Sequence, residues 1–145
     1  MILSKSANYA VRAALYLSES AGDGPVPVDE MAEQLDVPRN YLSKVLHELA
    51  RTDILESTRG PGGGFRLARP AEEVALSDIV RVYDEVPDET TCLLGRSACS
   101  DVDPCRAHDR WARVRSQLID FLADTRLADL AGRPPDALRM TTPDP

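Results

Sequence analysis

One six-residue turn narrows the folds that this chain can adopt. Residues 59–64 read RGPGGG and hold four of the chain's eight glycines. Stretches typical of short strands flank the turn at Ile54–Thr58 and Phe65–Ala68, so a hairpin with a narrow tip is predicted. Glycine tolerates a positive φ and lets the backbone approach another molecule closely.

A strongly amphipathic helix precedes the hairpin. Between residues 38 and 51, apolar side chains recur at positions i, i+3, i+4 and i+7, which is the spacing of one buried helix face. Two further helices are expected at residues 2–20 and 28–35, and a tight turn at Asp36-Val37 follows them. Pro38 is expected at the first helical position, where its missing N–H costs nothing. Helix, tight turn, helix and hairpin together predict a winged helix-turn-helix.

The second half of the chain predicts two more helices and a loop. We expect helices over about 76–84 and 105–124, and a loop over 86–104. The second of these helices carries a near-heptad apolar stripe, which favours pairing with another copy of the chain; packing within its own domain is the alternative. The stripe consists of Trp111, Val114, Leu118, Phe121 and Leu122. The predicted fold is mainly α: a winged helix-turn-helix with a two-stranded wing and a long C-terminal dimerisation helix.

The chain is expected to divide into three regions. Residues 1–70 would form a DNA-binding winged helix-turn-helix, 71–131 the cysteine-containing loop and the dimerisation helix, and 132–145 a disordered tail. No apolar run exceeds five residues, so no membrane-spanning helix is predicted. The N-terminus shows no secretory signal. We therefore expect a cytoplasmic protein without a membrane partner.

The charge distribution is compatible with a nucleic-acid partner, although the net charge is −7. Residues 39–69 contain six basic and three acidic side chains, a local net charge of +3. A positive segment inside an acidic chain can attract phosphate while the acidic remainder discourages indiscriminate binding.

Polar side chains line the exposed face of the third predicted helix. In a helix-turn-helix, the N-terminal residues of this helix lie against base edges in the major groove. Arg39 could form hydrogen bonds to O6 and N7 of guanine, and Asn40 could pair with N6 and N7 of adenine. Tyr41, Ser43 and Lys44 suit phosphate contact and orientation. An ordinary solvated face is the alternative, but the basic hairpin that follows favours double-stranded DNA.

The hairpin predicts a second DNA contact. Its glycine tip is narrow enough for the minor groove, whose negative potential attracts an arginine. Arg59 and Gly60 at the start of the turn are therefore candidate contacts. A phosphate loop of an enzyme is one alternative, but no Lys-Ser/Thr pair follows the glycines; a loose turn is another. No residue needs a catalytic role, so we expect neither an enzyme nor a small-molecule substrate.

The three cysteines lie close together in the sequence, as a metal or redox site requires. Cys92, Cys99 and Cys105 fall within fourteen residues, and His108 follows. An odd number of cysteines without an export signal does not indicate a disulfide framework. Three thiolates and an imidazole suit iron–sulfur or zinc by softness. Structural zinc usually pairs its ligands two to four residues apart, so gaps of six and five residues favour a larger cluster.

A candidate for the fourth ligand lies at the start of the long predicted helix. At positions i and i+3, Cys105 and His108 are expected to share one helical face there. A solvated His108 is the alternative. Two aspartates in the same loop are alternative ligands: Asp101 and Asp103.

Four motifs together resemble one family. They are LSxxxxYAV at residues 3–11, YL at 41–42, RGPGGGF at 59–65, and the cysteine loop. The chain resembles the IscR-like iron–sulfur cluster regulators, the winged-helix family often called Rrf type two, over about residues 1–131. This resemblance implies a homodimeric transcription regulator whose cluster state changes its affinity or sequence choice for DNA.

The resemblance also implies a ligand set. Regulators of iron–sulfur biogenesis hold a [2Fe–2S] cluster with three cysteines and one histidine, and the matching residues here are Cys92, Cys99, Cys105 and His108. Nitric-oxide-sensing relatives hold a [4Fe–4S] cluster and can recruit an aspartate at the position of Asn8, a poor anionic ligand. We therefore expect a [2Fe–2S] sensor of cluster or redox status. A [4Fe–4S] regulator responsive to nitric oxide or iron and a zinc-stapled structural module are the alternatives.

Overall fold

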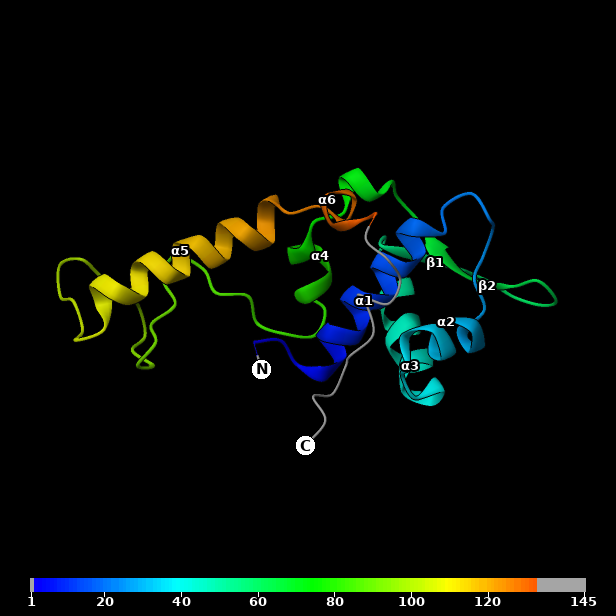
Figure 1. The fold of residues 1–145 in the computed structure, drawn as a ribbon. Coiled ribbons are helices and arrows are strands. Elements are labelled where there is room, and N and C mark those ends of the chain that lie inside the picture. Colours follow the sequence, from blue (N-terminus) through cyan, green and yellow to red (C-terminus); the bar gives the residue numbers. More distant parts are fainter. Residues whose placement is uncertain (1, 133–145) are drawn as a thin grey trace, which may run out of the picture.

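The computed structural model describes residues 2–132, and the fold within them is mainly helical with one two-stranded sheet (Figure 1). The elements in order are α1 (Lys5–Glu19), α2 (Val28–Leu35), α3 (Arg39–Ala50), β1 (Leu55–Thr58), β2 (Gly64–Leu67), the 3-10 helix η1 (Ala71–Glu73), α4 (Leu76–Val80), α5 (His108–Asp124) and α6 (Leu127–Leu130). The predicted winged helix-turn-helix is confirmed. None of the described helices is long and apolar enough to cross a membrane. The predicted tail, 132–145, lies outside the described residues except for Gly132.

The first and third helices begin later than their periodicity predicted. Ser4 caps α1, because its hydroxyl accepts a hydrogen bond from the Ala7 N–H at 3.1 Å, so the helix starts at Lys5. Pro38 precedes α3 with an extended backbone (φ −56°, ψ 123°) instead of occupying its first turn. Its carbonyl still accepts from the Leu42 N–H at 3.0 Å, as the residue before a helix does.

The helices around the cysteine loop are shorter than predicted. After α4 the chain tightens into i to i+3 hydrogen bonds, such as Val82 N–H to the Ile79 carbonyl at 3.2 Å, and helix is lost before residue 84. The Cys105 carbonyl likewise accepts from the His108 N–H at 3.0 Å, so α5 begins at His108. The prediction that Cys105 and His108 share a helical face was therefore wrong.

A third segment completes the wing. Strands β1 and β2 pair antiparallel, with Leu55 opposite Leu67 and Thr58 opposite Gly64. On the other edge of β2, Val26 and Phe65 exchange two backbone hydrogen bonds, at 2.8 and 2.9 Å. The loop before α2, expected only as a break between helices, thus fixes the base of the hairpin.

One hydrophobic core includes residues from both halves of the chain. Fully buried side chains from α1, α3, α4 and α6 meet in it, among them Ala13, Leu46, Ile79 and Leu127. The core therefore continues past residue 70. The division there into DNA-binding and sensing regions stays a prediction about function.

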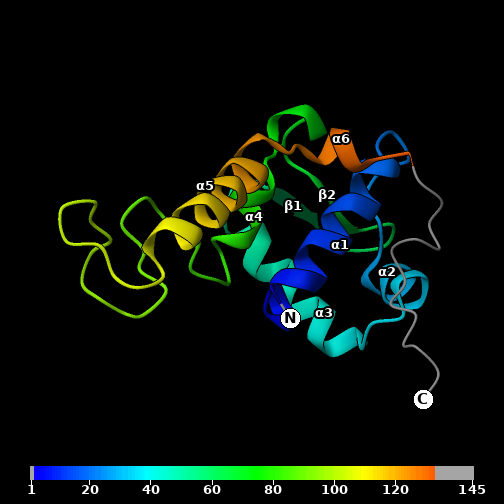
Figure 2. The ribbon, with the colours of Figure 1, turned by 60° about the vertical axis from the view of Figure 1, so that its left-hand side comes forward.

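Helix α5 is attached to this core by its C-terminal end. Leu122 is buried, the Leu76 N–H donates to the Thr125 carbonyl at 3.0 Å, and the Leu127 N–H donates to the Val74 carbonyl at 3.0 Å. The other end of α5 projects away from the core together with the cysteine loop (Figures 1 and 2). The loop and the wing consequently occupy opposite ends of the molecule.

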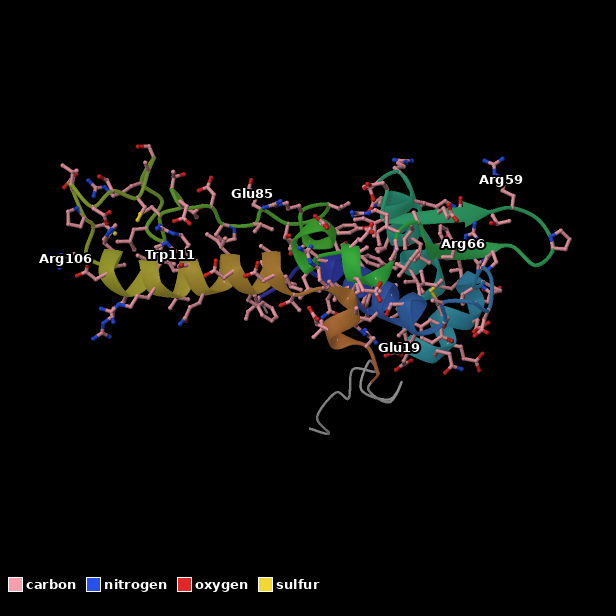
Figure 3. The ribbon with its side chains drawn as sticks, turned by 90° about the horizontal axis from the view of Figure 1, so that it is seen from above. Glu19, Arg59, Arg66, Glu85, Arg106 and Trp111 are labelled. Carbon is pink, nitrogen blue, oxygen red and sulfur yellow. The ribbon has the colours of Figure 1, made fainter. Side chains whose placement is uncertain are left out.

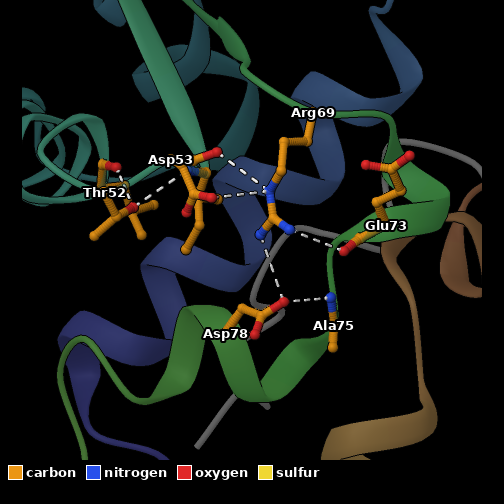
Figure 4. Close-up of polar contacts among 8 residues, drawn as sticks. Thr52, Asp53, Arg69, Glu73, Ala75 and Asp78 are labelled. Carbon is orange, nitrogen blue, oxygen red and sulfur yellow. Dashed lines mark hydrogen bonds and ion pairs between the residues drawn. The ribbon is translucent and has the colours of Figure 1, made fainter.

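Arg69 connects the wing to the segment that follows it (Figure 4). Its Nε donates to the Asp53 carbonyl and its Nη1 to the Glu73 carbonyl, both at 3.3 Å. Its Nη2 lies 3.6 Å from Asp78 Oδ2, and that oxygen also accepts from the Ala75 N–H at 3.0 Å. Arg69 is therefore engaged within the fold.

We expect Gly64→Ala to lower the free energy of unfolding by about 1–3 kcal/mol. A Cβ at Gly64 would lie 2.2 Å from the Val26 carbonyl oxygen, so the bridge beside β2 must open to admit it. Urea denaturation measures the effect, and Pro61→Ala at the exposed tip is the control. Equal stability of the two variants would contradict a closely packed bridge.

Candidate metal centre and nucleic-acid interface

The predicted DNA-contacting side chains of α3 lie on its surface. Arg39, Asn40 and Lys44 are exposed and Ser43 is half-buried. Their spacing places them on one side of the helix, opposite the buried stripe that includes Leu42 and ends at Leu49. The helix can therefore present this face to a groove of DNA without disturbing the core.

Half of the basic side chains in residues 39–69 are already paired within the domain. Arg39 forms an ion pair with Asp29 of α2, Arg66 pairs with Glu56 across the wing, and Arg69 makes the contacts described above. The others, which form no ion pair within residues 2–132, are Lys44, Arg51 and Arg59. The unpaired positive charge of this segment is thus carried by the third helix, its end and the wing.

Tyr41 joins the start of α3 to the start of α1. Its hydroxyl lies 2.7 Å from Ser6 Oγ, and its ring meets Tyr9 edge to face at 5.4 Å between centroids. Lys5 Nζ lies 5.8 Å from the centroid of each ring, a cation–π arrangement. Sequence reasoning missed Lys5, although its i, i+4 spacing to Tyr9 indicated that the two share a face.

The wing presents Arg59 to solvent. Its side chain projects away from the hairpin (Figure 3), and Gly60 beside it adopts a φ of +89° that other residues rarely adopt. The turn is closed by the Gly63 N–H, which donates to the Gly60 carbonyl at 2.9 Å. An edge-to-face contact between His47 of α3 and Phe65 of β2, at 5.2 Å, sets the hairpin against the helix.

The four predicted ligands meet in two pairs. Cys92 Sγ lies 3.9 Å from Cys105 Sγ, and Cys99 Sγ lies 3.1 Å from His108 Nδ1. All three cysteines are free thiols and half-buried. Across residues 2–132, no three histidine, cysteine or acidic side chains converge as they would around a single metal ion. The four predicted ligands are therefore arranged as two separate pairs.

The two aspartates of the loop are engaged elsewhere. Asp101 Oδ1 lies 2.6 Å from His108 Nε2, on the ring nitrogen that does not face a cysteine. Asp103 forms an ion pair with Arg96, which also donates to the Asp103 carbonyl at 2.8 Å. Within the described residues, neither carboxylate joins Cys92 and Cys105 to form a group of three potential ligands.

Backbone donors favour the thiolate of Cys92. The Arg96 N–H lowers the pKa of the Cys92 thiol most, and the Leu94 N–H and the neighbouring Cys105 thiol lower it further. The thiolate is the form of cysteine that binds metals. This end of the loop is thus suited to a soft metal.

Two side chains of α5 hold the loop through one carbonyl. The Thr91 carbonyl accepts from Trp111 Nε1 at 2.7 Å and from Arg115 Nη1 at 2.9 Å. The predicted apolar stripe therefore divides, because Trp111 faces the loop. Val114 and Phe121 remain 55% and 54% exposed. The i, i+4 spacing of Trp111 and Arg115 was the available signal for this missed role.

Comparisons with known proteins agree with this architecture. The model of the Rrf2 family, described as an iron-dependent transcriptional regulator, matches residues 3–133. The transcriptional regulator IscR of Sodalis glossinidius is 33% identical over 130 residues, which cover 90% of this chain and 78% of that protein.

Two solved structures extend the similarity to the fold. CymR, the global cysteine regulator of B. subtilis, has a TM-score of 0.76 and 26% identity, covering 90% of this chain and 96% of that one. IscR of T. potens has a TM-score of 0.69 and 25% identity, covering 90% and 85%. These relatives are named as regulators and not as enzymes, as the sequence predicted. The chain belongs to the Rrf2 family of transcriptional regulators, which bind DNA.

Proposed function

We propose that this regulator is a dimer that senses iron–sulfur cluster or redox status through a [2Fe–2S] cluster. The observation that carries the proposal is the pairing of Cys92 with Cys105 and of Cys99 with His108. In a [2Fe–2S] cluster each iron takes two protein ligands, so each pair would supply the ligands of one iron.

The spacing of the Cys92–Cys105 pair fits two ligands of one tetrahedral metal. Two thiolates on one tetrahedral metal at ~2.3 Å lie about 3.8 Å apart, and the Cys92 and Cys105 sulfurs are separated by 3.9 Å. Cys99 and His108 would hold the second iron. When bound, the cluster supplies a redox-active centre whose loss or oxidation changes the charge and order of the loop.

The winged helix-turn-helix, residues 1–70, would read DNA with both of its exposed elements. We place Arg39 and Asn40 at base edges of the major groove and Lys44 at a phosphate. In the minor groove we place Arg59 and Gly60 of the wing. Support comes from the exposure of these residues and from the lack of ion-pair partners for Lys44 and Arg59 among the described residues. The remaining predicted contacts on α3 are Tyr41 and Ser43.

The exposed face of α5 is the proposed dimer interface, within the region 71–131. A groove of about 360 Å³ runs beside it, lined by Leu118, Phe121 and Leu122 of α5 together with Val11 of α1 and Val80 of α4. Apolar patches of this kind mark protein–protein contacts. A second copy would cover the groove and set two reading helices over two half-sites.

A thiol-based regulator is a second candidate. CymR, a structural neighbour, is named a cysteine regulator, and the two sulfurs of Cys92 and Cys105 are near enough for a short movement to join them. A [4Fe–4S] regulator and a zinc-stapled module are the further alternatives. Metal and sulfide content separates all of them from the proposed cluster.

We expect anaerobically purified protein to be coloured and to contain two irons and two acid-labile sulfides per chain, the composition of a [2Fe–2S] cluster. Cys99→Ala should bleach it, because one iron loses a ligand. Ser97→Ala, an exposed change in the same loop, is the control. Colourless protein with one zinc supports the zinc module, and metal-free protein with a Cys92–Cys105 disulfide supports the thiol regulator; either result contradicts the cluster.

The proposed DNA contacts predict different losses for two mutants. Arg59→Ala should weaken binding to a specific operator by about 1–3 kcal/mol. Lys44→Ala should weaken binding to all DNA sequences alike. It should also reduce the slope of log affinity against log salt concentration by about one per subunit. Titrations at matched salt measure both, on a genomic fragment selected by the protein. Arg66→Ala, on the same wing but paired with Glu56, is the control. Unchanged binding by Arg59→Ala would remove the wing from the interface.

The proposed interface predicts that Phe121→Asp dissociates the dimer. A buried, unpaired carboxylate is costly, whereas Ser116→Asp on the opposite side of α5 should leave the dimer intact. Sedimentation velocity measures both variants. A monomeric wild type would contradict the proposed dimer, and a Phe121→Asp variant that remains dimeric would place the interface elsewhere.

A further inference from the structure

We propose that Asp101 is a positioning residue that orients His108, so that Nδ1 and not Nε2 is the nitrogen presented to a metal. This proposal rests on the proposed function insofar as His108 is a cluster ligand. The sequence offered Asp101 only as an alternative ligand. The structure assigns it to the far side of the imidazole ring.

The ring of His108 is held on two sides. The residue is only 7% exposed, and its backbone N–H donates to the Cys105 carbonyl at 3.0 Å where α5 begins. Nδ1 lies 3.1 Å from Cys99 Sγ, and Nε2 lies 2.6 Å from Asp101 Oδ1. The two nitrogens therefore face different chemistry.

The carboxylate decides which nitrogen carries the proton. An ionised carboxylate can only accept hydrogen bonds, so Nε2–H must donate to Asp101. In the neutral ring Nδ1 then has the free lone pair, and the Cys99 thiol donates to it. Metal-bound histidines usually donate their other N–H to a carboxylate, a carbonyl or water, which fixes both tautomer and orientation. Asp101 occupies that place.

Asp103 provides a matched comparison. It lies two residues further along the same exposed loop, and it pairs with Arg96. Within residues 2–132, it forms no hydrogen bond to the ring of His108, whose Nε2 faces Asp101. Replacing Asp103 changes the loop charge by the same amount as replacing Asp101. Asp103→Ala also releases Arg96, so an effect of Asp101→Ala that exceeds the effect of Asp103→Ala is assigned to the contact with His108.

The metal-free protein gives the first test, by ¹⁵N nuclear magnetic resonance of the imidazole nitrogens at about pH 8.5, where an ordinary imidazole is neutral. The chain has two histidines, and the second is an internal reference. His47 Nδ1 lies 2.7 Å from the Ser43 carbonyl, so its proton must sit on Nδ1. The two rings should show opposite tautomers.

We expect the proton of His108 on Nε2 in the wild type, a mixture of tautomers in Asp101→Ala, and no change in Asp103→Ala. Asp101→Asn should restore the wild-type tautomer in part, because its amide oxygen can accept the same proton. A wild-type proton on Nδ1 of His108, or an Asp101→Ala spectrum equal to that of the wild type, would overturn the proposal.

The iron-loaded protein gives the second test. Loss of a ligand's outer partner typically lowers metal affinity about 10–100-fold, so Asp101→Ala should lose its cluster in air faster than the wild type by a factor of about this size. Asp103→Ala should lose its cluster more slowly than Asp101→Ala. His108→Ala sets the limit for complete loss of the ligand. If the wild type takes up no iron, the proposed function fails. If the wild type takes up iron and the cluster of Asp101→Ala survives as long in air as that of the wild type, only the role of Asp101 fails.

Discussion

The carbonyl of Thr91 is the contact on which the geometry of the candidate metal site depends. Residues 81–107 contain no helix or strand, so the path of the cysteine loop depends on local turn hydrogen bonds and on side-chain contacts from α5. Trp111 and Arg115, one turn apart on α5, both donate to this oxygen immediately before Cys92. These two hydrogen bonds hold the loop beside α5, which would lower the ordering of the chain that the proposed cluster requires on binding.

Near its N-terminal end, the irregular segment 81–107 contacts α3, the proposed DNA-reading helix. The Tyr83 hydroxyl donates to the Val45 carbonyl of α3 at 2.7 Å, and burial raises the pKa of Tyr83, so the hydroxyl keeps the proton that it donates. Asp84, the next residue, accepts from the Ser4 N–H at the start of α1 at 2.8 Å. Residues 81–107 thus contact α3 and also hold all three cysteines.

Periodicity and turn chemistry were enough to predict the winged helix-turn-helix, because each of its helices carries its own apolar face and the glycine turn is local. Contacts between distant segments were not predictable in this way. The bridge of Val26 to Phe65 joins segments that no short-range pattern relates. The pairing of Asp101 with His108 depends on the path of an irregular loop. The pairing of Arg39 with Asp29 depends on the angle between two helices.

The attachment of α5 by one end makes it a lever. Its seventeen residues span about 25 Å, with the fulcrum at Leu122 and the cysteine loop at the free tip. A tilt of about 5° at the fulcrum moves such a tip by about 2 Å. A force applied at the loop would therefore act on the buried core at Leu122 with a moment arm of about 20 Å.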